Sequence, residues 1–142
     1  MSLDLLGELN WLAVIAGGLA YFVLGALWYS PALFGRPWQR AIGWDPERTP
    51  PEVRPTFYVI PAVAYTVIAA TIALLARASG SDDIGTGIVL GLVVGVGISA
   101  MHTLGDAVFD PNKPAPWTWF AITAGYHVIG QLIVAVLVSV WR

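Results

Sequence analysis

Four long apolar runs follow one another along the 142-residue chain, and short polar stretches separate them. They predict membrane spans at about residues 11–29, 56–76, 84–104 and 117–141. The first run contains no charged residue, and at a rise of about 1.5 Å per residue it is about 28 Å long, close to the hydrocarbon thickness of a bilayer. The pattern predicts an all-α membrane protein, a four-transmembrane-helix bundle in which residues 1–142 form a single transmembrane domain.

The ends of these runs carry aromatic and capping residues. Five of the seven tryptophans lie at predicted span ends, namely Trp11, Trp28, Trp117, Trp119 and Trp141. Amphipathic rings concentrate at the headgroup level of a bilayer, so this distribution favours membrane anchoring over a water-soluble helical core. Asn10 is positioned to cap the first helix, and Asp82 and Asp83 to cap the third.

Composition supports the same class of protein. Hydrophobic residues make up 57% of the chain and charged residues 11%, whereas a soluble domain carries about 25% charged residues. This balance excludes a soluble globular enzyme, and a net charge of −2 gives no basic excess for binding nucleic acid. The chain has no cysteine, which excludes disulfides and thiolate chemistry. Asp4 and Glu8 without a basic residue before the first span do not form a cleavable signal peptide.

The basic residues predict an orientation in the cell membrane. Two of them, Arg77 and Arg142, lie on the side of the termini, and five lie on the other side: Arg36, Arg40, Arg48, Arg54 and Lys113. Because cytoplasmic loops of membrane proteins are enriched in Lys and Arg, we expect residues 30–55 and 105–116 in the cytoplasm and both termini outside.

The first loop begins with an amphipathic segment. Its interfacial residues are Trp28, Tyr29, Phe34, Arg36, Trp38 and Arg40. Pro37 can begin a short helix that runs to about Ile42, with the arginines near lipid phosphates and the rings in the interface. A segment that recognises a substrate is the alternative. Residues 45–55, with four prolines, predict an extended, solvated strap.

Two stretches are similar to a known family. They are residues 28–35, Trp-Tyr-Ser-Pro-Ala-Leu-Phe-Gly, followed by Trp38, and residues 124–127, Ala-Gly-Tyr-His. They resemble a bacterial family of small integral membrane proteins catalogued as domain of unknown function 1761, and the resemblance covers nearly the whole chain. It implies a four-helix membrane architecture and carries no established activity.

The third span contains a stripe of small residues. Gly87, Gly91, Gly95 and Ser99 recur at intervals of four and therefore share one side of the helix. Small residues allow the close backbone approach that drives helix association in lipid. The partner can be another helix of the same chain or a second copy. Within the chain, the first helix offers a possible partner face at Ala13, Gly17, Tyr21 and Gly25.

Polar residues inside the apolar spans are the candidates for a site. His102 and Asp106 are four residues apart on the third span, so the carboxylate can orient the imidazole. On the fourth span, Thr123, His127 and Gln131 form a stripe, and His127 lies near the bilayer midplane. Ionisable groups at that depth normally face the bundle interior or a cavity. With Ser99, these residues form the candidate polar or ligand site.

Several interpretations of these residues stay open. The polar groups can simply fix helix register by hydrogen bonds, or His102, His127 and Asp106 can form a proton or ion pathway. A third interpretation is a metal or haem held by His102 and His127, although two histidines without a closer motif carry little information. A hydrolase is the least favoured, because Ser30 and Ser99 lack a nucleophile-elbow pattern.

These interpretations lead to a prediction of function. We expect a membrane protein that binds or conducts a small solute or ion; the alternatives are an accessory protein without a ligand and a metal- or haem-binding protein. The sequence assigns no catalytic residue and no cofactor. Partners are the lipid bilayer and, because four thin helices enclose little interior, further copies of the chain, with no nucleic acid.

Overall fold

The computed structural model describes residues 3–48 and 54–142. All regular secondary structure in these residues is helical. The elements are η1 (Leu3–Glu8), α1 (Trp11–Trp28), α2 (Gly35–Ala41), α3 (Thr56–Ser79), α4 (Ile84–Val94), η2 (Gly95–Ala100), α5 (Met101–Phe109) and α6 (Pro116–Val140). The helices α1, α3, the continuous α4–η2–α5 and α6 are each long and apolar enough to cross a membrane. This confirms the predicted fold class, and it is consistent with a multi-pass membrane protein.

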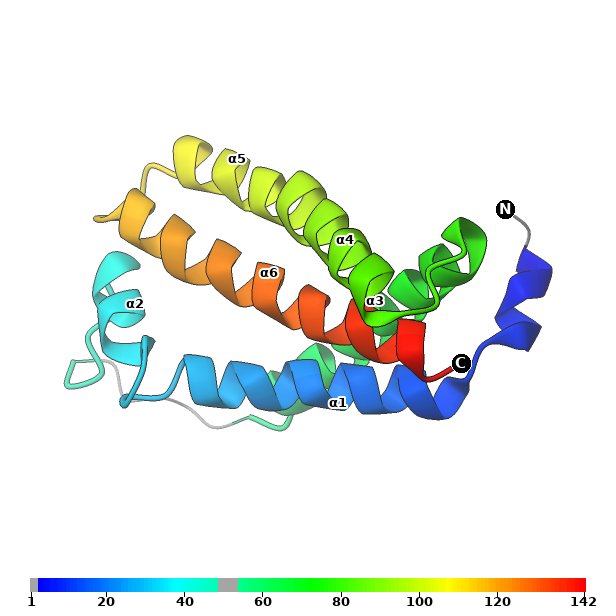
Figure 1. The fold of residues 1–142 in the computed structure, drawn as a ribbon. Helices are drawn as coiled ribbons and strands as arrows, with labels where there is room; N and C mark the ends of the chain where they lie inside the picture. Colours follow the sequence, from blue (N-terminus) through cyan, green and yellow to red (C-terminus); the bar gives the residue numbers. More distant parts are fainter. Residues whose placement is uncertain (1–2, 49–53) are drawn as a thin grey trace.

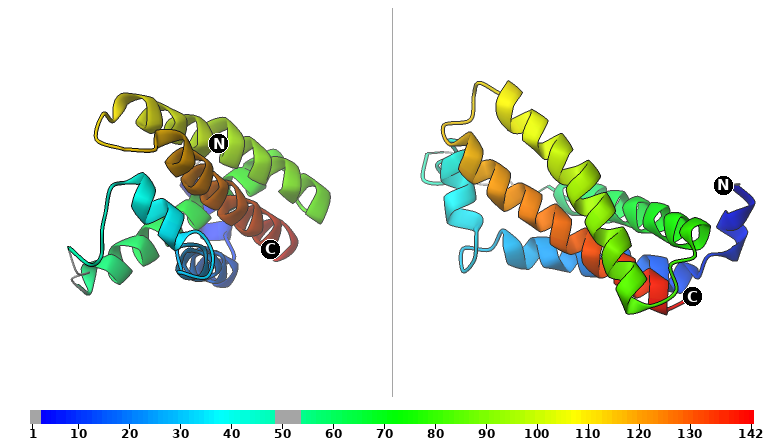
Figure 2. Two further views of the ribbon diagram at one scale, coloured as in Figure 1. Left: turned by 90° about the vertical axis from the view of Figure 1, so that its left-hand side faces the viewer. Right: turned by 45° about the horizontal axis from the view of Figure 1, so that its top comes forward.

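The last helix occupies the centre of the bundle. In Figure 1, α6 lies between α1 on one side and the α4–η2–α5 span on the other, with α3 behind them. The helices α1 and α3 also pack on each other, so α1, α3 and α6 form the main core. The third span leans on α6 along its length and touches α3 mainly through α4 (Figure 2). Much of its surface is therefore exposed.

Local sequence determines where the membrane helices begin and end. The Asn10 side chain accepts hydrogen bonds from the backbone of Leu12 (3.1 Å) and Ala13 (3.3 Å), which confirms the predicted cap of α1. Asp83 forms a capping box with Thr86 at the start of α4. The helix α3 ends at Gly80, whose φ of 72° is accessible to glycine without strain.

The glycine stripe of the third span lies against α6. A methyl group built on Gly91 would lie 2.7 Å from the Leu132 Cα, and one on Gly95 would lie 3.0 Å from the Val128 Cα. Gly87 approaches the Val136 Cα in the same way. Glycine is thus required for the close contact of the two backbones. The contact is within the chain, and its partner is α6 and not the first helix, which the sequence offers as a possible partner.

The third span differs from the predicted helix in length and in regularity. It continues to Phe109, five residues beyond the predicted end, and its middle turn η2 is a π-helix. A π turn takes more residues than an α turn, so it rotates the chain less per residue. In an α-helix, residues spaced by four drift gradually around the helix, and the π turn counteracts this drift. Ser99 therefore faces α6 on the same side of the third span as Gly95.

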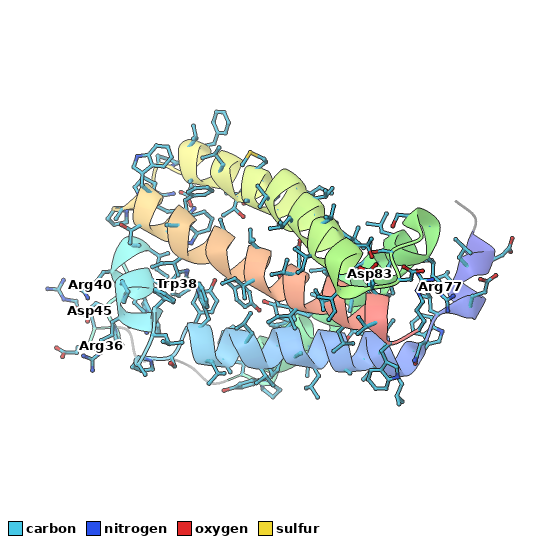
Figure 3. The ribbon with its side chains drawn as sticks, viewed as in Figure 1. Arg36, Trp38, Arg40, Asp45, Arg77 and Asp83 are labelled. Atoms are coloured by element: carbon cyan, nitrogen blue, oxygen red, sulfur yellow. The ribbon has the colours of Figure 1, made fainter. Side chains whose placement is uncertain are left out.

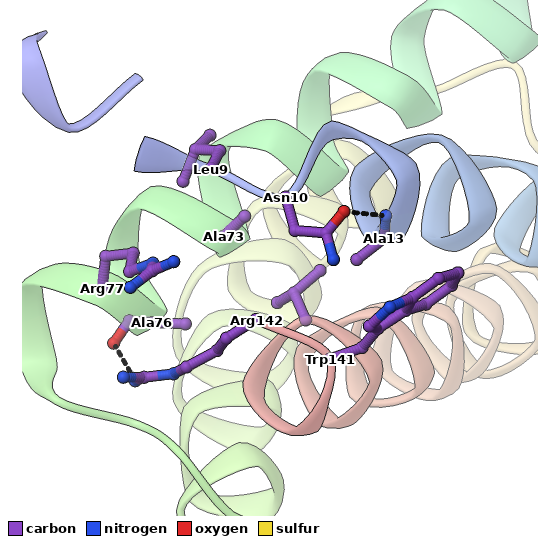
Figure 4. A pocket seen from close by; sticks show the side chains of 9 residues that line it. Leu9, Asn10, Ala13, Ala73, Ala76, Arg77, Trp141 and Arg142 are labelled. Atoms are coloured by element: carbon purple, nitrogen blue, oxygen red, sulfur yellow. Dashed lines mark hydrogen bonds between the residues drawn. The ribbon is translucent and has the colours of Figure 1, made fainter. Parts of the chain in front are cut away.

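Arginines close the bundle at the end where both termini lie (Figure 1). The Arg77 guanidinium donates to the Glu8 carbonyl oxygen at 2.9 Å, and the Arg142 guanidinium donates to carbonyl oxygens of Ala76 and Ser81. Positive charge is favourable at the C-terminal end of α3, where carbonyls are left without helical partners. The hollow between these groups has about 10 Å³ of space, about what one water needs (Figure 4).

Candidate functional site

A cluster of aromatic rings fills the core between α1, α3 and α6. The Tyr21 ring stacks on Tyr65 with centroids 4.4 Å apart and lies 5.2 Å from the Tyr126 ring. The His127 ring is 5.0 Å from Tyr126. Tyr29 completes the cluster from the end of α1, 5.3 Å from Tyr126. We call Tyr21, Tyr29, Tyr65, Tyr126 and His127 the tyrosine–histidine cluster.

Two hydrogen bonds hold the centre of this cluster. The Tyr21 hydroxyl and His127 Nδ1 share a hydrogen bond of 2.6 Å, so His127 faces the bundle interior, as expected of an ionisable group in a span. The Tyr126 hydroxyl donates to the Tyr21 carbonyl oxygen at 3.2 Å. Tyr21 and Tyr126 are 0% and 1% exposed. Among the described residues, His127 Nε2 has no hydrogen-bond partner and is free to bind one.

Glycines make room for the two central tyrosines. A methyl group on Gly130 would overlap the Tyr21 ring, and one on Gly25 would lie 2.8 Å from the Tyr126 hydroxyl. Gly25 of α1 thus faces Tyr126 of α6, and Gly130 of α6 faces Tyr21 of α1. The helices therefore approach closely enough for each tyrosine to reach the opposite backbone, and a side chain at either glycine would separate them.

The cluster borders a groove between the C-terminal half of α1 and the N-terminal half of α3. This aromatic groove has a volume of about 220 Å³ and is lined by Phe22, Gly25, Ala26, Tyr29, Phe57, Tyr58, Pro61, Tyr65 and Tyr126. Pro61 has no backbone N–H, so the Phe57 carbonyl one turn earlier lacks its helical donor. The groove thus combines aromatic walls with phenol side chains, and its lining residue Phe57 has a carbonyl that Pro61 cannot pair.

The polar stripe of α6 lies inside the bundle next to the cluster. We call Ser99, Thr123, His127 and Gln131 the polar seam. Gln131, 4% exposed, donates from Nε2 to the Ser99 hydroxyl at 2.6 Å. Its Oε1 is buried without a partner among the described residues, and so is the Thr123 hydroxyl, which lies near the Tyr29 phenol without hydrogen-bonding geometry. Buried polar atoms of this kind are normally satisfied by water or a ligand.

The structure separates His102 and Asp106 from this seam. Both side chains are exposed on α5, whereas His127 is partly buried beside Tyr21. No hydrogen bond or ion pair joins His102 to Asp106 in the described part of the chain, so the carboxylate does not orient the imidazole. Within residues 3–48 and 54–142, no group of three His, Asp or Glu side chains can hold a metal ion.

The short helix α2 lies across the end of the bundle. It begins at Gly35, two residues before the predicted start at Pro37, because the Trp38 N–H already bonds to the Phe34 carbonyl. Trp38 points from α2 into the bundle, whereas Arg36 and Arg40 point away from it (Figure 3).

The aromatic residues around α2 have protein neighbours. The Trp38 ring lies 5.2 Å from Tyr29 and the Phe34 ring 4.5 Å from Trp28, whose indole donates to the Ile122 carbonyl. A methyl group built on Gly125 would lie 3.4 Å from the Trp28 ring. The two stretches that carry the family resemblance, residues 28–35 and 124–127, are therefore in contact with each other.

Side-chain hydrogen bonds within a turn hold the loop between α5 and α6. Asp110 accepts a hydrogen bond from the Asn112 backbone and pairs with Lys113, whose ammonium lies 4.2 Å from the Trp119 ring centre. The bonds from Lys113 and Asn112 lower the pKa of the Asp110 carboxyl. Gly43, with a φ of 72°, packs on Pro114 and ties this loop to α2.

Sequence reasoning missed three of the cluster tyrosines as site residues. The sequence indicates Tyr21 only as part of a small-residue helix face and Tyr126 only within the stretch 124–127 that resembles the family, and it does not single out Tyr65. The sequence did contain a signal: Gly25 and Gly130 stand among larger apolar residues in two helices, at the level of the aromatic rings. Glycine inside a helix costs about 0.5–1 kcal/mol relative to alanine, so it indicates a close approach by another group.

Comparison with known proteins adds the family. No curated protein and no solved structure matches the chain significantly. The sequence model of one family of proteins of unknown function, DUF1761, matches residues 12–139. These residues contain nearly all of the four spans, the aromatic groove and the polar seam. The chain belongs to this family, DUF1761.

Proposed function

We propose that this protein binds a small ring-sized molecule with a hydrogen-bonding group in the aromatic groove. The observation that carries the proposal is the groove itself, because aromatic walls and phenol side chains converge there between three helices. Small-molecule sites are typically concave and mostly apolar, with a few polar groups that fix orientation. A ligand of this kind dissolves in the bilayer and enters from it.

The size of the groove supports a single ring as the body of the ligand. Its volume of about 220 Å³ exceeds the ~150 Å³ of an engineered cavity that binds benzene. The Tyr65 phenol can donate to or accept from a hydroxyl or carbonyl group of the ligand, and the Phe57 carbonyl can only accept. The predicted binding of a small solute is thereby narrowed to an uncharged, ring-containing molecule.

Binding is better supported than conduction. A proton or ion pathway needs His102, Asp106 and His127 to lie one after another along the same route. His102 and Asp106 are exposed on α5, whereas His127 is partly buried, so the three groups do not line such a route. The accessory interpretation predicts no ligand, and buried unpartnered atoms at Thr123 and Gln131 favour an occupied or hydrated interior over a dry one. A metal or haem site is less well supported, because His102 is exposed on α5 whereas His127 is partly buried and bonded to Tyr21.

Titration with p-cresol and toluene tests the proposal. Both probes carry one ring, and only p-cresol has a hydroxyl. The titrations are made in the same detergent and followed by the tyrosine-ring NMR signals of the protein. We expect saturable binding of both probes. We expect p-cresol to bind about two- to tenfold more tightly, which is the contribution of one hydrogen bond. Equal, non-saturable partitioning of the two probes would contradict the proposal.

Two tryptophan substitutions provide the matched pair for that titration. Ala26 is exposed and lines the groove, so Ala26→Trp fills the groove without entering the core. Val23 is exposed one turn earlier on α1 and does not line it. We expect Ala26→Trp to abolish binding of both probes and Val23→Trp to leave it unchanged. If Ala26→Trp bound the probes with wild-type affinity, the aromatic groove would not be their binding site.

We also propose the orientation that the basic residues predict, with the loops 30–55 and 105–116 in the cytoplasm and both termini outside. The chain has no cysteine, so single cysteines can report sidedness. A membrane-impermeant maleimide should label Ser79→Cys in intact cells and Glu47→Cys only after permeabilisation. The reverse pattern would refute this orientation.

We further propose that the protein assembles as a homo-oligomer. The third span packs on α6 and leaves its outer side exposed, including Gly97, where an added methyl group would have no atom within 4 Å. Close helix packing in lipid uses such small residues. Light scattering of the detergent-solubilised protein should give at least two chains per particle, and the mass of one chain would refute the assembly.

A further inference from the structure

A second hollow lies outside the bundle, on the side of α2 that faces away from the spans. Its volume is about 720 Å³, and its polar and aromatic lining residues are Arg36, Gln39, Arg40, Trp44, Asp45 and Glu47. Figure 3 shows Arg36, Arg40 and Asp45 together at this end of the molecule. We call it the α2 hollow.

Two of the four charged residues that line this hollow are arginines. Arg36 and Arg40 are four residues apart, and the Arg40 Nε lies 3.4 Å from the Arg36 carbonyl oxygen that it bonds. This leaves both terminal guanidinium nitrogens free to donate. Neither guanidinium has a carboxylate oxygen within 4 Å in residues 3–48 and 54–142. Two unpaired guanidiniums on one helix face suit a phosphate group.

The other two charged lining residues are carboxylates, Asp45 and Glu47. The Asp45 carboxylate accepts from the Glu47 backbone at 3.0 Å, and this turn keeps the two residues close together. Asp45 also pairs with Arg48 at 3.4 Å, outside the hollow. Opposite charges thus share one concave surface without contacting each other. A ligand with an anionic and a cationic group can bridge them.

The position of α2 indicates where such a ligand comes from. The helix is fixed at the end of the spans by its buried residues Gly35 and Ala41 and by its Trp38, whose ring lies 5.2 Å from the Tyr29 ring. Tryptophan and tyrosine concentrate at the headgroup level of a bilayer. Arg36 and Arg40 therefore lie within reach of lipid phosphates.

From this charge pattern we infer that the α2 hollow binds the phosphoethanolamine headgroup of a membrane lipid. Arg36 and Arg40 take the phosphate, and Asp45 and Glu47 take the primary ammonium. A purely basic patch would prefer an anionic lipid, whereas the paired charges prefer a zwitterion that can donate hydrogen bonds. The inference is independent of the proposed ligand of the aromatic groove, which is lined by residues of α1, α3 and α6 and by none of the α2 hollow.

Native mass spectrometry of the full chain with lipids of equal acyl chains tests the inference. We expect phosphatidylethanolamine to be retained in preference to phosphatidylcholine, which cannot donate from its ammonium, and to phosphatidylglycerol, which has none. Retention of phosphatidylglycerol equal to or above that of phosphatidylethanolamine would overturn the inference. So would equally tight binding of soluble phosphoethanolamine, since the lipid would then add nothing.

Charge-neutralising variants separate the contributions of the arginines and the carboxylates. Arg36→Gln and Arg40→Gln should weaken retention of phosphatidylethanolamine and phosphatidylglycerol alike, by about two- to fivefold for each charge, the range of an exposed ion pair. Glu47→Gln should weaken phosphatidylethanolamine alone. Arg54→Gln removes the same charge from the same loop outside the hollow and should change nothing. An unchanged lipid preference in Glu47→Gln would overturn the role of the carboxylates.

Discussion

A methyl group at Gly91 should push the third span away from α6. In the structure, the Cβ of Gly91→Ala would lie 2.7 Å from the Leu132 Cα, about 0.7 Å closer than the 3.4 Å at which ordinary contact begins. The obstructing atom belongs to the backbone, so no rotamer change relieves the clash. The two helices must separate, and Gly87 and Gly95 then lose their own close contacts with α6.

The size of the effect follows from two opposing contributions. Overpacking costs about 1–3 kcal/mol, and replacing a helical glycine by alanine returns about 0.5–1 kcal/mol. We therefore expect Gly91→Ala to lower the free energy of unfolding by about 1–2 kcal/mol. Gly105→Ala is the matched control, because nothing lies within 4 Å of its added methyl group. It should raise the free energy of unfolding by up to about 1 kcal/mol.

Reversible unfolding in mixed micelles, followed by tryptophan fluorescence, measures both variants. The measurement should be made at two protein concentrations, because packing within one chain is independent of concentration and packing between copies is not. Equal stability of Gly91→Ala and Gly105→Ala would refute the close contact of α4 with α6. A loss for Gly91→Ala that shrinks as the concentration rises would assign the glycine stripe to a second copy.

Three further predictions concern the core and the helix caps. Gly130→Ala should lower the free energy of unfolding by about 1–3 kcal/mol because its methyl group overlaps the Tyr21 ring, whereas Gly125→Ala, at 3.4 Å from Trp28, should be tolerated; equal effects in a denaturation series would contradict the packing. Tyr21→Phe should cost about 1–3 kcal/mol by leaving His127 Nδ1 without its partner, and His127 ring NMR shifts should change with it; unchanged shifts would refute the hydrogen bond. Hydrogen bonds from Thr86 lower the pKa of Asp83, so its contribution to stability is present above the ordinary carboxyl pKa and is lost as the pH falls through the lowered value. Unfolding measured across acidic pH should lose this dependence in Asp83→Asn, which can still cap α4, and keep it in Asp82→Asn; an unchanged profile in Asp83→Asn would remove the cap from the account.

Much of the fold could be predicted from the sequence because lipid imposes simple requirements. Uncharged runs of bilayer length must form helices that satisfy their own backbone, and this requirement predicts the four spans, with caps at Asn10 and Asp83. The π turn of the third span could not be predicted in this way. It depends on the fit of Gly95 and Ser99 against α6, and neither residue signals a wider turn by itself.

The candidate site was predicted only in part, since sequence spacing gives a helix face but not its neighbour. The stripe Thr123, His127 and Gln131 does share one side of α6, yet what it meets depends on how α1 and α3 pack. His102 and Asp106 are likewise spaced by four residues on the third span, yet both are exposed on its outer side. Tyr65, far from His127 in sequence, reaches the cluster only through tertiary packing.

The most direct test of the account locates p-cresol on the protein by intermolecular NOEs between its ring protons and assigned aromatic side chains. The proposed site predicts contacts to Tyr65 and Tyr126, at the base of the aromatic groove, and their loss in Ala26→Trp. Contacts only to exposed surface rings such as Phe109 and Trp117, retained in Ala26→Trp, would contradict it.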